Sequence, residues 1–278
     1  MKKLVGYQGN KGAYSEKAAS LMYPGYESIG YRTLTDAFVA IKEGMLNVAV
    51  IPVENSSIGT ITKSLDLMDE FKFQVMGEYF MPIRHFLIGP KGTDLKNVEN
   101  VYSHPAALDQ CQKYLSQFKN WQLIPVNDTA GAVKLISEKA LTDSVAIAGE
   151  LTSDIYGLDI IDEHINDFEH NQTRFWAIGQ NDNYKILPIE KRNKMSIVVR
   201  LDHRAGALHN FLGVMNMLNI NLTSLISRPN KDNPWFYIFF IDLELNSTDR
   251  RIPLIQDNLK YLGIKFHSLG DYGTLKVS

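Results

Sequence analysis

The sequence predicts an α/β protein in two parts: a larger α/β region and, after it, a smaller domain with the ferredoxin-like order βαββαβ. Two observations support this fold class. Short β-rich runs alternate with helical patterns up to about residue 157, which is typical of a parallel or mixed sheet covered by helices. After a polar stretch at 180–193, the pattern becomes strand, helix, strand, strand, helix, strand over residues 194–278, the order of a ferredoxin-like domain.

Three strand and helix pairs define the larger region. The runs 3–7, 48–53 and 143–148 predict strands, and the patterns at 14–23, 62–71 and 150–157 predict the helices that follow them. Gly157 is expected to end the last of these helices. In such sheets ligands gather beyond the carboxyl ends of the strands. This rule selects polar residues that follow predicted strands, namely Gln8, Asn10, Glu54, Asn55, Ser56, Ser103 and His104.

The smaller domain follows a predicted linker. Residues 180–193 are polar, contain Pro188 and show no hydrophobic period, as expected of a connecting segment. The strands of the domain are predicted at 195–202, 221–229, 235–244 and 264–270, and its helices at 206–219 and 252–263. The first helix shows apolar residues with the spacing of one helix face at Leu208, Phe211, Leu212 and Met215.

Composition excludes several function classes. At 278 residues with 45% apolar content the chain is long enough for two cores, and a net charge of -2 without a long basic run argues against nucleic acid as a partner. The first ten residues do not resemble a signal peptide, and no apolar run approaches the roughly 20 residues that span a bilayer. We therefore expect a cytoplasmic protein without a membrane partner. The single cysteine, Cys111, cannot form an intramolecular disulfide.

Each polar candidate also has a purely structural interpretation. Asn55 and Ser56 stand where a helix cap is wanted, and His104 before Pro105 fits a helix start. His85 in a predicted strand is interpreted as packing, and an arginine such as Arg174 usually lies at the surface. The segment 9–15 lacks the Gly-Lys-Ser/Thr ending of a phosphate loop and is interpreted as a tight turn. His, Asp and Glu show no metal-ligand spacing, so no metal is expected.

Several segments, taken together and in order, resemble one family, prephenate dehydratase. The segments that carry the resemblance are 9–19 (GNKGAYSEKAA), 51–61 (IPVENSSIGTI), 102–111 (YSHPAALDQC), 146–161 (AIAGELTSDIYGLDII) and 171–179 (NQTRFWAIG). Two more, 206–212 (GALHNFL) and 225–229 (LISRP), resemble regulatory motifs of the ACT domain that follows the catalytic domain in this family. Three residues depart from the family pattern: Ala106 where glutamine is common, Ala205 where proline is usual, and Ile226 where a glutamate is usual.

The resemblance implies a domain plan. A catalytic domain of two α/β lobes, similar to periplasmic binding proteins, would cover residues 1–180. Its first lobe would be built from 1–76 and 158–180, and its second from 77–157. A linker at 181–193 would lead to a ferredoxin-like ACT regulatory domain at 194–278.

The resemblance also implies an activity, the conversion of prephenate to phenylpyruvate in L-phenylalanine biosynthesis, without a cofactor and with feedback by L-phenylalanine. It implies that Thr173 donates to the leaving hydroxyl, while Arg174 suits a substrate carboxylate because its guanidinium is a fixed, forked cation. The remaining substrate-binding candidates are Glu54, Asn55, Ser56, Ser57, Ser103, His104 and Phe175. The effector-binding candidates are Gly206, Ala207, Leu208, Ser227, Arg228 and Pro229.

Two alternatives remain open at this point. Dehydration of arogenate would use nearly the same residues, and a cleft joined to an ACT domain could instead be a noncatalytic amino-acid sensor. The family also implies a homodimer or homotetramer.

Overall fold

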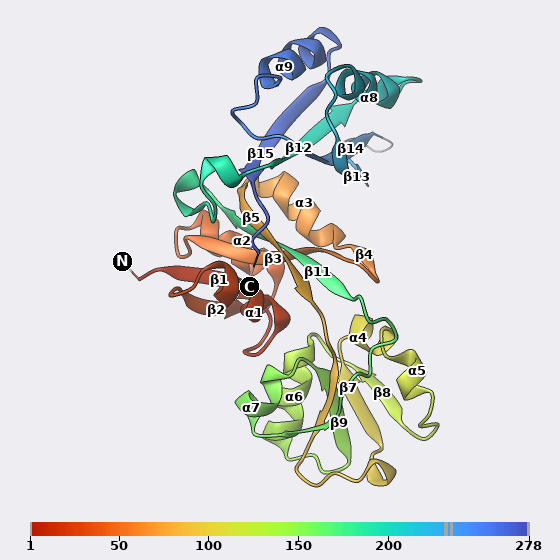
Figure 1. The fold of residues 1–278 in the computed structure, drawn as a ribbon. Coiled ribbons are helices and arrows are strands. Elements are labelled where there is room, and N and C mark those ends of the chain that lie inside the picture. Colours follow the sequence, from red (N-terminus) through yellow and green to blue (C-terminus); the bar gives the residue numbers. More distant parts are fainter. Residues whose placement is uncertain (1, 231–232, 234–235, 277–278) are drawn as a thin grey trace. The chain divides into compact units, whose positions relative to one another are not determined.

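The computed structural model describes residues 2–230, 233 and 236–276 (Figure 1). Two compact units emerge from its contacts, one formed by residues 1–64 and 79–175 and the other by 65–78 and 176–278. Both combine sheets with helices, so the α/β fold class is confirmed. Within the described ranges, no helix combines the length and the apolar character needed to cross a membrane.

The first sheet has six strands in the order β2-β1-β3-β11-β5, with β4 paired to β3. Its strands are β1 (Leu4–Gln8), β2 (Glu27–Tyr31), β3 (Val48–Asn55), β4 (Gly59–Thr60), β5 (Gln74–Pro82) and β11 (Gln172–Gly179). The associated helices are α1 (Tyr14–Met22), α2 (Leu34–Lys42) and α3 (Thr62–Phe71). Strand β1 is parallel to both β2 and β3, which places the carboxyl ends of β1 and β3 at one edge.

The second sheet has the order β10-β6-β9-β7-β8. Its strands are β6 (Phe86–Gly89), β7 (Asn100–Ser103), β8 (Gln122–Pro125), β9 (Ser144–Ala148) and β10 (Asp159–Asp162). Its helices are η1 (Leu95–Asn97), α4 (Pro105–Asp109), α5 (Gln112–Leu115), α6 (Thr129–Lys139) and α7 (Leu151–Tyr156). As predicted, Gly157 ends α7, with a positive φ of 67°.

Alternation along β9 explains why this sheet is covered on both faces. Val145 and Ile147 belong to one core cluster with residues of α4 and α5, whereas Ala146 and Ala148 belong to another with residues of α6. Successive side chains of a strand point to opposite faces, so each face receives every second residue. A strand buried on both faces reads as a continuous apolar run, as this one does.

The second unit contains the predicted βαββαβ domain. Its elements are β12 (Lys194–Leu201), α8 (Ala207–Met217), β13 (Leu222–Pro229), β14 (Tyr237–Leu243), α9 (Ile252–Tyr261) and β15 (Lys265–Tyr272). The sheet order is β13-β14-β12-β15 and every pairing is antiparallel, which confirms the ferredoxin-like prediction. The strand predicted from residue 235 begins with Trp235, which lies outside the described residues. The segment before β12 forms the short helices η2 (Asp182–Tyr184) and η3 (Ile189–Lys191).

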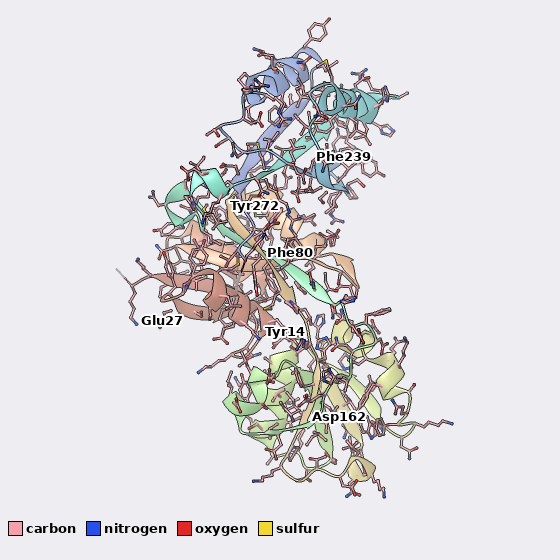
Figure 2. The ribbon with its side chains drawn as sticks, viewed as in Figure 1. Tyr14, Glu27, Phe80, Asp162, Phe239 and Tyr272 are labelled. Carbon is pink, nitrogen blue, oxygen red and sulfur yellow. The ribbon has the colours of Figure 1, made fainter. Side chains whose placement is uncertain are left out.

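One face of this sheet packs on its two helices. Ile197 and Val199 of β12 share a core cluster with Phe211 of α8 and Leu259 of α9. Tyr272, at the end of β15 and labelled in Figure 2, is fully buried. Its ring meets that of Trp176 edge-on at a centroid distance of 6.2 Å. The domain therefore has its own apolar core.

Ion pairs join the same sheet to α3 within the second unit. Arg228 of β13 donates from Nε and Nη2 to Asp66 at 3.0 and 3.1 Å. Arg200 of β12 donates from Nη2 to both carboxylate oxygens of Asp69 at 2.6 and 2.8 Å. Asp66 and Asp69 are three residues apart on the helix, so they share one face. Two arginines on two different strands thus form ion pairs with one side of α3.

Candidate active site

Two residues from neighbouring strands form the centre of the candidate site. Asn55 is the last residue of β3 and Thr173 the second of β11. The Asn55 amide nitrogen lies 2.9 Å from Thr173 Oγ and 2.8 Å from Asn171 Oδ1. Asn55 and Thr173 are only 5% and 8% exposed. A buried amide in a low-dielectric position binds its partners more strongly than it would in water.

Backbone donors fix the direction of the bond between them. The N–H groups of Ser57 and Ile58 donate to Asn55 Oδ1 at 2.9 and 3.2 Å. A backbone N–H can only donate, so the oxygen of the Asn55 amide faces these groups and its NH2 faces Thr173. Thr173 Oγ therefore accepts from Asn55 and retains its own proton for another acceptor.

Both residues border a cavity of about 210 Å³. Its wall is formed by Gln8, Gly9, Ala13, Tyr14, Ser15, Pro52, Asn55, Ile58, Ile61, Ile83, His85, His104, Ala106, Ala107, Gln110, Asn127, Asp128, Thr129, Thr173 and Phe175. Among these lining residues there is no lysine or arginine. The polar part of the wall consists of amides, hydroxyls, two imidazoles and one carboxylate, so it binds by hydrogen bonds more than by formal charge.

Gln110 links this centre to a buried histidine. The Gln110 amide nitrogen donates to Asn55 Oδ1 at 3.3 Å, and its Oε1 accepts from Asn171 Nδ2 at 2.8 Å. His85 Nε2 lies 2.8 Å from the same Oε1. Burial lowers the pKa of His85 to about 4, although the bond to Gln110 acts in the opposite direction. His85 is therefore neutral at pH 7.

His104 caps α4 and also faces the cavity. Its Nδ1 accepts from the backbone N–H of Ala106 at 3.2 Å, so in the neutral ring the proton resides on Nε2. Burial lowers its pKa, while the negative charge of Asp128 acts in the opposite direction. The sequence interpretation of His104 as a helix start is confirmed, and its free ring edge adds a donor to the cavity.

Two helices begin at the cavity wall. Tyr14 and Ser15 open α1, which has no side-chain cap at Ala13, and Thr129 opens α6, which is capped by Asp128. Helix amino termini carry N–H groups and a partial positive charge that favour anions. The α1 end keeps its N–H groups without a side-chain cap, although the Glu16 carboxylate in its first turn accepts from Gly12 N at 2.5 Å. At the α6 end the Asp128 carboxylate already accepts from Gly131 N.

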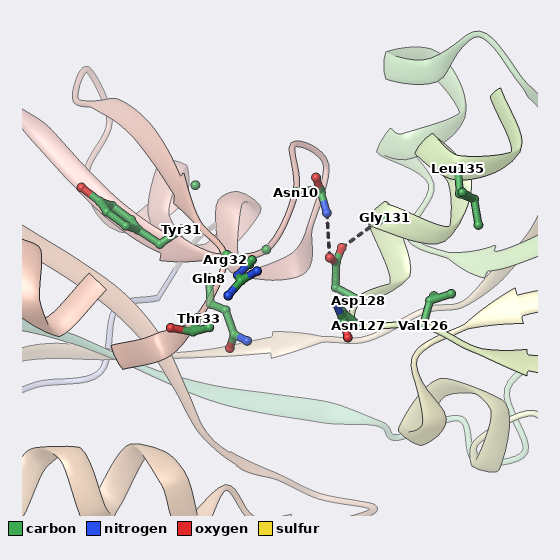
Figure 3. Close-up of a pocket in the computed structure, with 12 residues that line it drawn as sticks. Gln8, Asn10, Tyr31, Arg32, Thr33, Val126, Asn127, Asp128, Gly131 and Leu135 are labelled. Carbon is green, nitrogen blue, oxygen red and sulfur yellow. Dashed lines mark hydrogen bonds between the residues drawn. The ribbon is translucent and has the colours of Figure 1, made fainter. Parts of the chain in front are cut away.

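A second cavity of about 790 Å³ shares Gln8, Gly9, Asn127 and Asp128 with the first (Figure 3). Asn10, from the loop after β1, donates to Asp128 Oδ2 at 2.7 Å, and Asp128 Oδ1 accepts from Gly131 N at 2.7 Å. Figure 3 shows both bonds converging on the Asp128 carboxylate. The loop after β1 and the start of α6 are thereby tied together beside the cavities.

The structure brings together Asn55, His104, Thr173 and Phe175, all of which line the smaller cavity. The other predicted substrate residues lie elsewhere. Ser103 is fully buried and donates to Ile147 O at 2.6 Å. Ser56 donates to His170 O at 3.1 Å and accepts from Gln172 N at 2.9 Å. Ser57 takes part through its backbone only, as described above.

Arg174 and Glu54 are set apart by strand alternation. Thr173 and Phe175 line the cavity and Arg174 stands between them, so its side chain leaves the opposite face of β11. There its Nη1 lies 4.0 Å from Glu54 Oε2, and its guanidinium lies 5.8 Å from the centre of the Phe80 ring.

Sequence reasoning missed Gln110 and Asn171 and placed His85 in simple packing. Gln110 and Asn171 lie inside segments that carried the family resemblance, so a search for amide partners of Asn55 within those segments would have found them. His85 carried no local signal, because its partner is 25 residues away in the sequence.

The predicted effector residues cluster at two points of the ferredoxin-like domain. Gly206 precedes α8 with a φ of 79°, and Ala207 and Leu208 belong to or pack on the core. Ser227, Arg228 and Pro229 end β13, an edge strand of the sheet. Arg228 is engaged with Asp66, as described above.

A hydrogen-bonding cavity at the ends of parallel strands, on a chain that also carries a ferredoxin-like domain, indicates an α/β protein that binds a small molecule. A family model described as prephenate dehydratase matches residues 5–183, and the chain belongs to this family. It is 38% identical to the prephenate dehydratase of Methanocaldococcus jannaschii, over 88% of this chain and 90% of that protein. It is 35% identical to arogenate dehydratase 2 of Petunia hybrida, over 96% of this chain and 71% of that protein.

Solved structures show the same fold over nearly the whole chain. The prephenate dehydratase of Arthrobacter aurescens in complex with L-Phe matches with a TM-score of 0.84 at 26% identity, covering 97% of this chain and 90% of that one. A protein named GqqA, described as a novel type of quorum-quenching acylase, matches with a TM-score of 0.86 at 25% identity, covering 98% of both chains. The two-lobed catalytic fold with its ferredoxin-like domain is therefore the fold of this family.

Proposed function

We propose that this chain is a prephenate dehydratase, a carbon–oxygen lyase of the hydro-lyase class that converts prephenate to phenylpyruvate, CO2 and water. The observation that carries the proposal is the Thr173 hydroxyl, which accepts from Asn55 and so presents its proton to the cavity. A hydroxyl that already accepts a hydrogen bond is a better donor, because hydrogen bonds in a chain polarise one another.

The reaction needs such a donor at one point. The bond between the ring and its carboxylate breaks, and its electron pair enters the ring as CO2 leaves. The C4–O bond breaks with its electron pair on oxygen, and this oxygen takes a proton from solvent and departs as water. Thr173 donates its hydrogen bond to that oxygen as negative charge develops. A preorganised donor in a cavity of low dielectric stabilises this charge more than water does.

Neutral donors hold the two carboxylates of the substrate. The uncapped amino terminus of α1, the Ser15 hydroxyl and His104 Nε2–H are available along the cavity wall. Such groups bind an anion moderately. Moderate binding suits this reaction, since a cation held against the departing carboxylate would stabilise the ground state and slow its loss as neutral CO2.

Arg174 as a carboxylate clamp stays a prediction. Its side chain leaves β11 on the face opposite Thr173 and lies near Glu54 and Phe80. This placement favours a structural contribution to the strand. The contributions of Glu54, Ser56, Ser57 and Ser103 to binding are likewise best ascribed to positioning the cavity wall.

The test is a direct assay with purified protein. Prephenate is supplied and phenylpyruvate is followed by its ultraviolet absorbance in alkali, with the Thr173→Ala variant as the matched control. The proposal is supported if the wild-type chain forms phenylpyruvate and the Thr173→Ala variant does not. Binding of prephenate without turnover would instead identify the noncatalytic sensor.

Arogenate dehydration is the second candidate. A relative from Petunia hybrida carries that name and one from Arabidopsis thaliana is named for both activities. The Asp128 carboxylate on the cavity wall offers a partner for the ammonium group of arogenate. Because Asn10 and Gly131 already bind Asp128, we place prephenate first. Parallel kinetics on the two substrates separate them.

An acylase reaction is not favoured by the site. An acylase needs a nucleophile whose proton passes to an adjacent base. Thr173 Oγ instead accepts from the amide of Asn55, a group that cannot take a proton from it. Burial raises the pKa of the Cys111 thiol to about 12, which makes it a poor nucleophile at neutral pH.

The remaining features of the proposal follow the family. The catalytic domain covers 1–180, a linker covers 181–193, and an ACT domain at 194–278 binds L-phenylalanine between two copies of the chain and inhibits turnover. Gly206 and the end of β13 would contribute to this effector site. A homodimer or homotetramer in the cytoplasm is part of the same proposal.

A further inference from the structure

His85 lines the cavity, yet it has no part in the proposed chemistry. It lies between β5 and β6, it is 3% exposed, and its two ring nitrogens both have polar neighbours. A buried imidazole placed within hydrogen-bond distance of the candidate site can act on the reaction through its neighbours.

The direction of every bond between His85 and Thr173 follows from the backbone. The N–H groups after Asn55 fix its Oδ1. The group of Gln110 that faces this oxygen must then be its NH2, at 3.3 Å, which turns Gln110 Oε1 toward His85 and Asn171. An oxygen accepts, so His85 must donate from Nε2.

The two bonds to Gln110 Oε1 decide how firmly that amide is held. Asn171 Nδ2 and His85 Nε2 each lie 2.8 Å from this oxygen and together use its two lone pairs. Without His85, the amide is held by Asn171 at its oxygen and by the longer, 3.3 Å bond from its nitrogen to Asn55 Oδ1. A rotated Gln110 would set its oxygen against Asn55 Oδ1, and the repulsion would displace Asn55 from Thr173.

We propose that His85 is a positioning residue, whose neutral ring donates from Nε2 to Gln110 and so keeps Asn55 donating to Thr173. The reaction affected is the proposed dehydration, so this inference rests on that proposal. Its geometric basis, the protonated Nε2, is independent of any activity.

The far side of the ring is held as well. Nδ1 lies 3.1 Å from the Tyr14 hydroxyl, the two rings meet edge-on at 5.7 Å, and the backbone N–H of His85 donates to Asn166 Oδ1 at 2.7 Å. The Tyr14 hydroxyl has one proton, and both Arg84 O and the unprotonated Nδ1 of His85 lie where they accept it, so the two acceptors share this proton. Tyr14 and Gln110 are the polar partners that the structure gives the ring, and both are uncharged at neutral pH.

Three substitutions separate the donor from the bulk of the ring. His85→Gln places an amide nitrogen near the position of Nε2, His85→Asn places one near Nδ1, and His85→Leu removes both. We expect His85→Asn and His85→Leu to lower kcat roughly 10- to 100-fold, the usual effect of losing a group that orients a functional residue. KM should change less than about threefold, and His85→Gln should restore most of kcat.

His267→Gln is the matched control. His267 is another histidine whose pKa burial lowers to about 4, but it belongs to the second unit. Its substitution should leave kcat unchanged. Equal kcat for wild type and His85→Asn, or an equal loss in His85→Gln and His85→Leu, would overturn the proposal. If His85→Leu fails to fold, the comparison of His85→Gln with His85→Asn still decides.

A spectroscopic measurement keeps this inference separate from the proposed function. The nitrogen-15 signals of the His85 ring in wild-type protein should show the Nε2-protonated tautomer at neutral pH. The Nδ1-protonated tautomer would refute the inference even in an active enzyme. If the wild-type protein shows the Nε2-protonated tautomer but does not turn over prephenate, the proposed function fails and the hydrogen-bond network is still supported.

Discussion

The candidate active site and the face of α3 that meets the ferredoxin-like sheet both withdraw polar groups from solvent, wholly at the site and partly on α3, but they use opposite chemistry. At the site Asn55, Gln110 and Thr173 are neutral and satisfy one another through hydrogen bonds. On α3, Asp66 and Asp69 are ion-paired with arginines. Further along the second unit, Glu78 is wholly buried and pairs with Lys194 at 2.6 Å.

The difference reflects where the charge comes from. Removing charges from water is costly unless they are paired with good geometry, and the α3 carboxylates are paired within the protein. Among the residues that line the cavity, Asp128 is the one carboxylate, and it accepts hydrogen bonds from the neutral Asn10 and Gly131 rather than from a cation. The anion instead arrives with the substrate. The neutral candidate site is therefore suited to a substrate whose charge changes during the reaction. The ion-paired face of α3 is suited to a permanent contact.

Removing the donor of the neutral network should have the largest effect. Thr173→Ala should lower kcat by roughly 100- to 10,000-fold, which is the rate enhancement that a positioned proton donor usually contributes. The fold should stay intact. Thr173→Ser is the control, because it keeps the hydroxyl. Normal turnover in the alanine variant, with a loss of only about 1 kcal/mol of stability as for a lost cap, would remove Thr173 from the mechanism.

Removing the partner of Thr173 tests whether the network acts as one unit. Asn55→Ala should lower kcat roughly 10- to 100-fold, since Thr173 loses the group that orients it. In the double variant with Thr173→Ala, little further loss is expected, because residues acting together are not additive. Additive losses, measured in a double-mutant cycle, would show that Asn55 acts on the substrate separately.

Breaking one ion pair on α3 should change regulation more than turnover. Asp66→Asn removes the partner of Arg228, and α3 follows the segment that carries Asn55 through the short strand β4. We expect basal turnover within about twofold and inhibition by L-phenylalanine weakened by at least about fivefold, the lower range of coupling between two sites.

Asp249→Asn is the control for that experiment. It breaks a different aspartate–arginine pair in the same domain, with Arg251 at 2.7 Å, and should leave the phenylalanine response unchanged. Titration by calorimetry beside activity assays distinguishes lost binding from lost coupling. If both variants respond like wild type, the α3 contact only supports the fold.

How far the sequence predicted this molecule depends on the range of the interactions concerned. Helix α3 was predicted residue for residue and the βαββαβ order was correct, because hydrophobic periodicity is local. Asn55 and His104 were selected by their position at the ends of predicted strands, and Thr173 was selected by the family resemblance of segment 171–179. Gln110 and His85 depend on contacts between distant segments, and no local pattern encodes such pairs.

Lowering the pH should weaken the neutral network through His85. Its folded pKa is about 4, against about 6.5 in an unfolded chain. Between these values the unfolded chain binds a proton that the folded chain does not, so the free energy of unfolding falls as the pH falls from about 6.5 to about 4.

In His85→Gln this dependence should be smaller than in wild type, as measured by denaturant unfolding at about pH 5 and about pH 7. His267 contributes with the same sign, so an unchanged slope in His85→Gln would assign the dependence to the second unit.

The smallest expected effect concerns Arg174, where the sequence and the geometry point in different directions. A clamp on a carboxylate would require the forked guanidinium, and Arg174→Lys would then raise KM markedly, since an ammonium cannot replace a bidentate grip. The structure sets this side chain on the face of β11 opposite the cavity, 4.0 Å from Glu54. We therefore expect KM and kcat within about threefold of wild type. The Arg174 side chain is itself only 7% exposed, whereas that of Glu54 is 44% exposed, so the effect of Arg174→Lys should appear in stability more than in turnover. Steady-state kinetics on prephenate, with Glu54→Gln as the matched variant, check this. A large rise in KM for Arg174→Lys but not for Glu54→Gln would restore the clamp and show that the site holds a fixed cation after all.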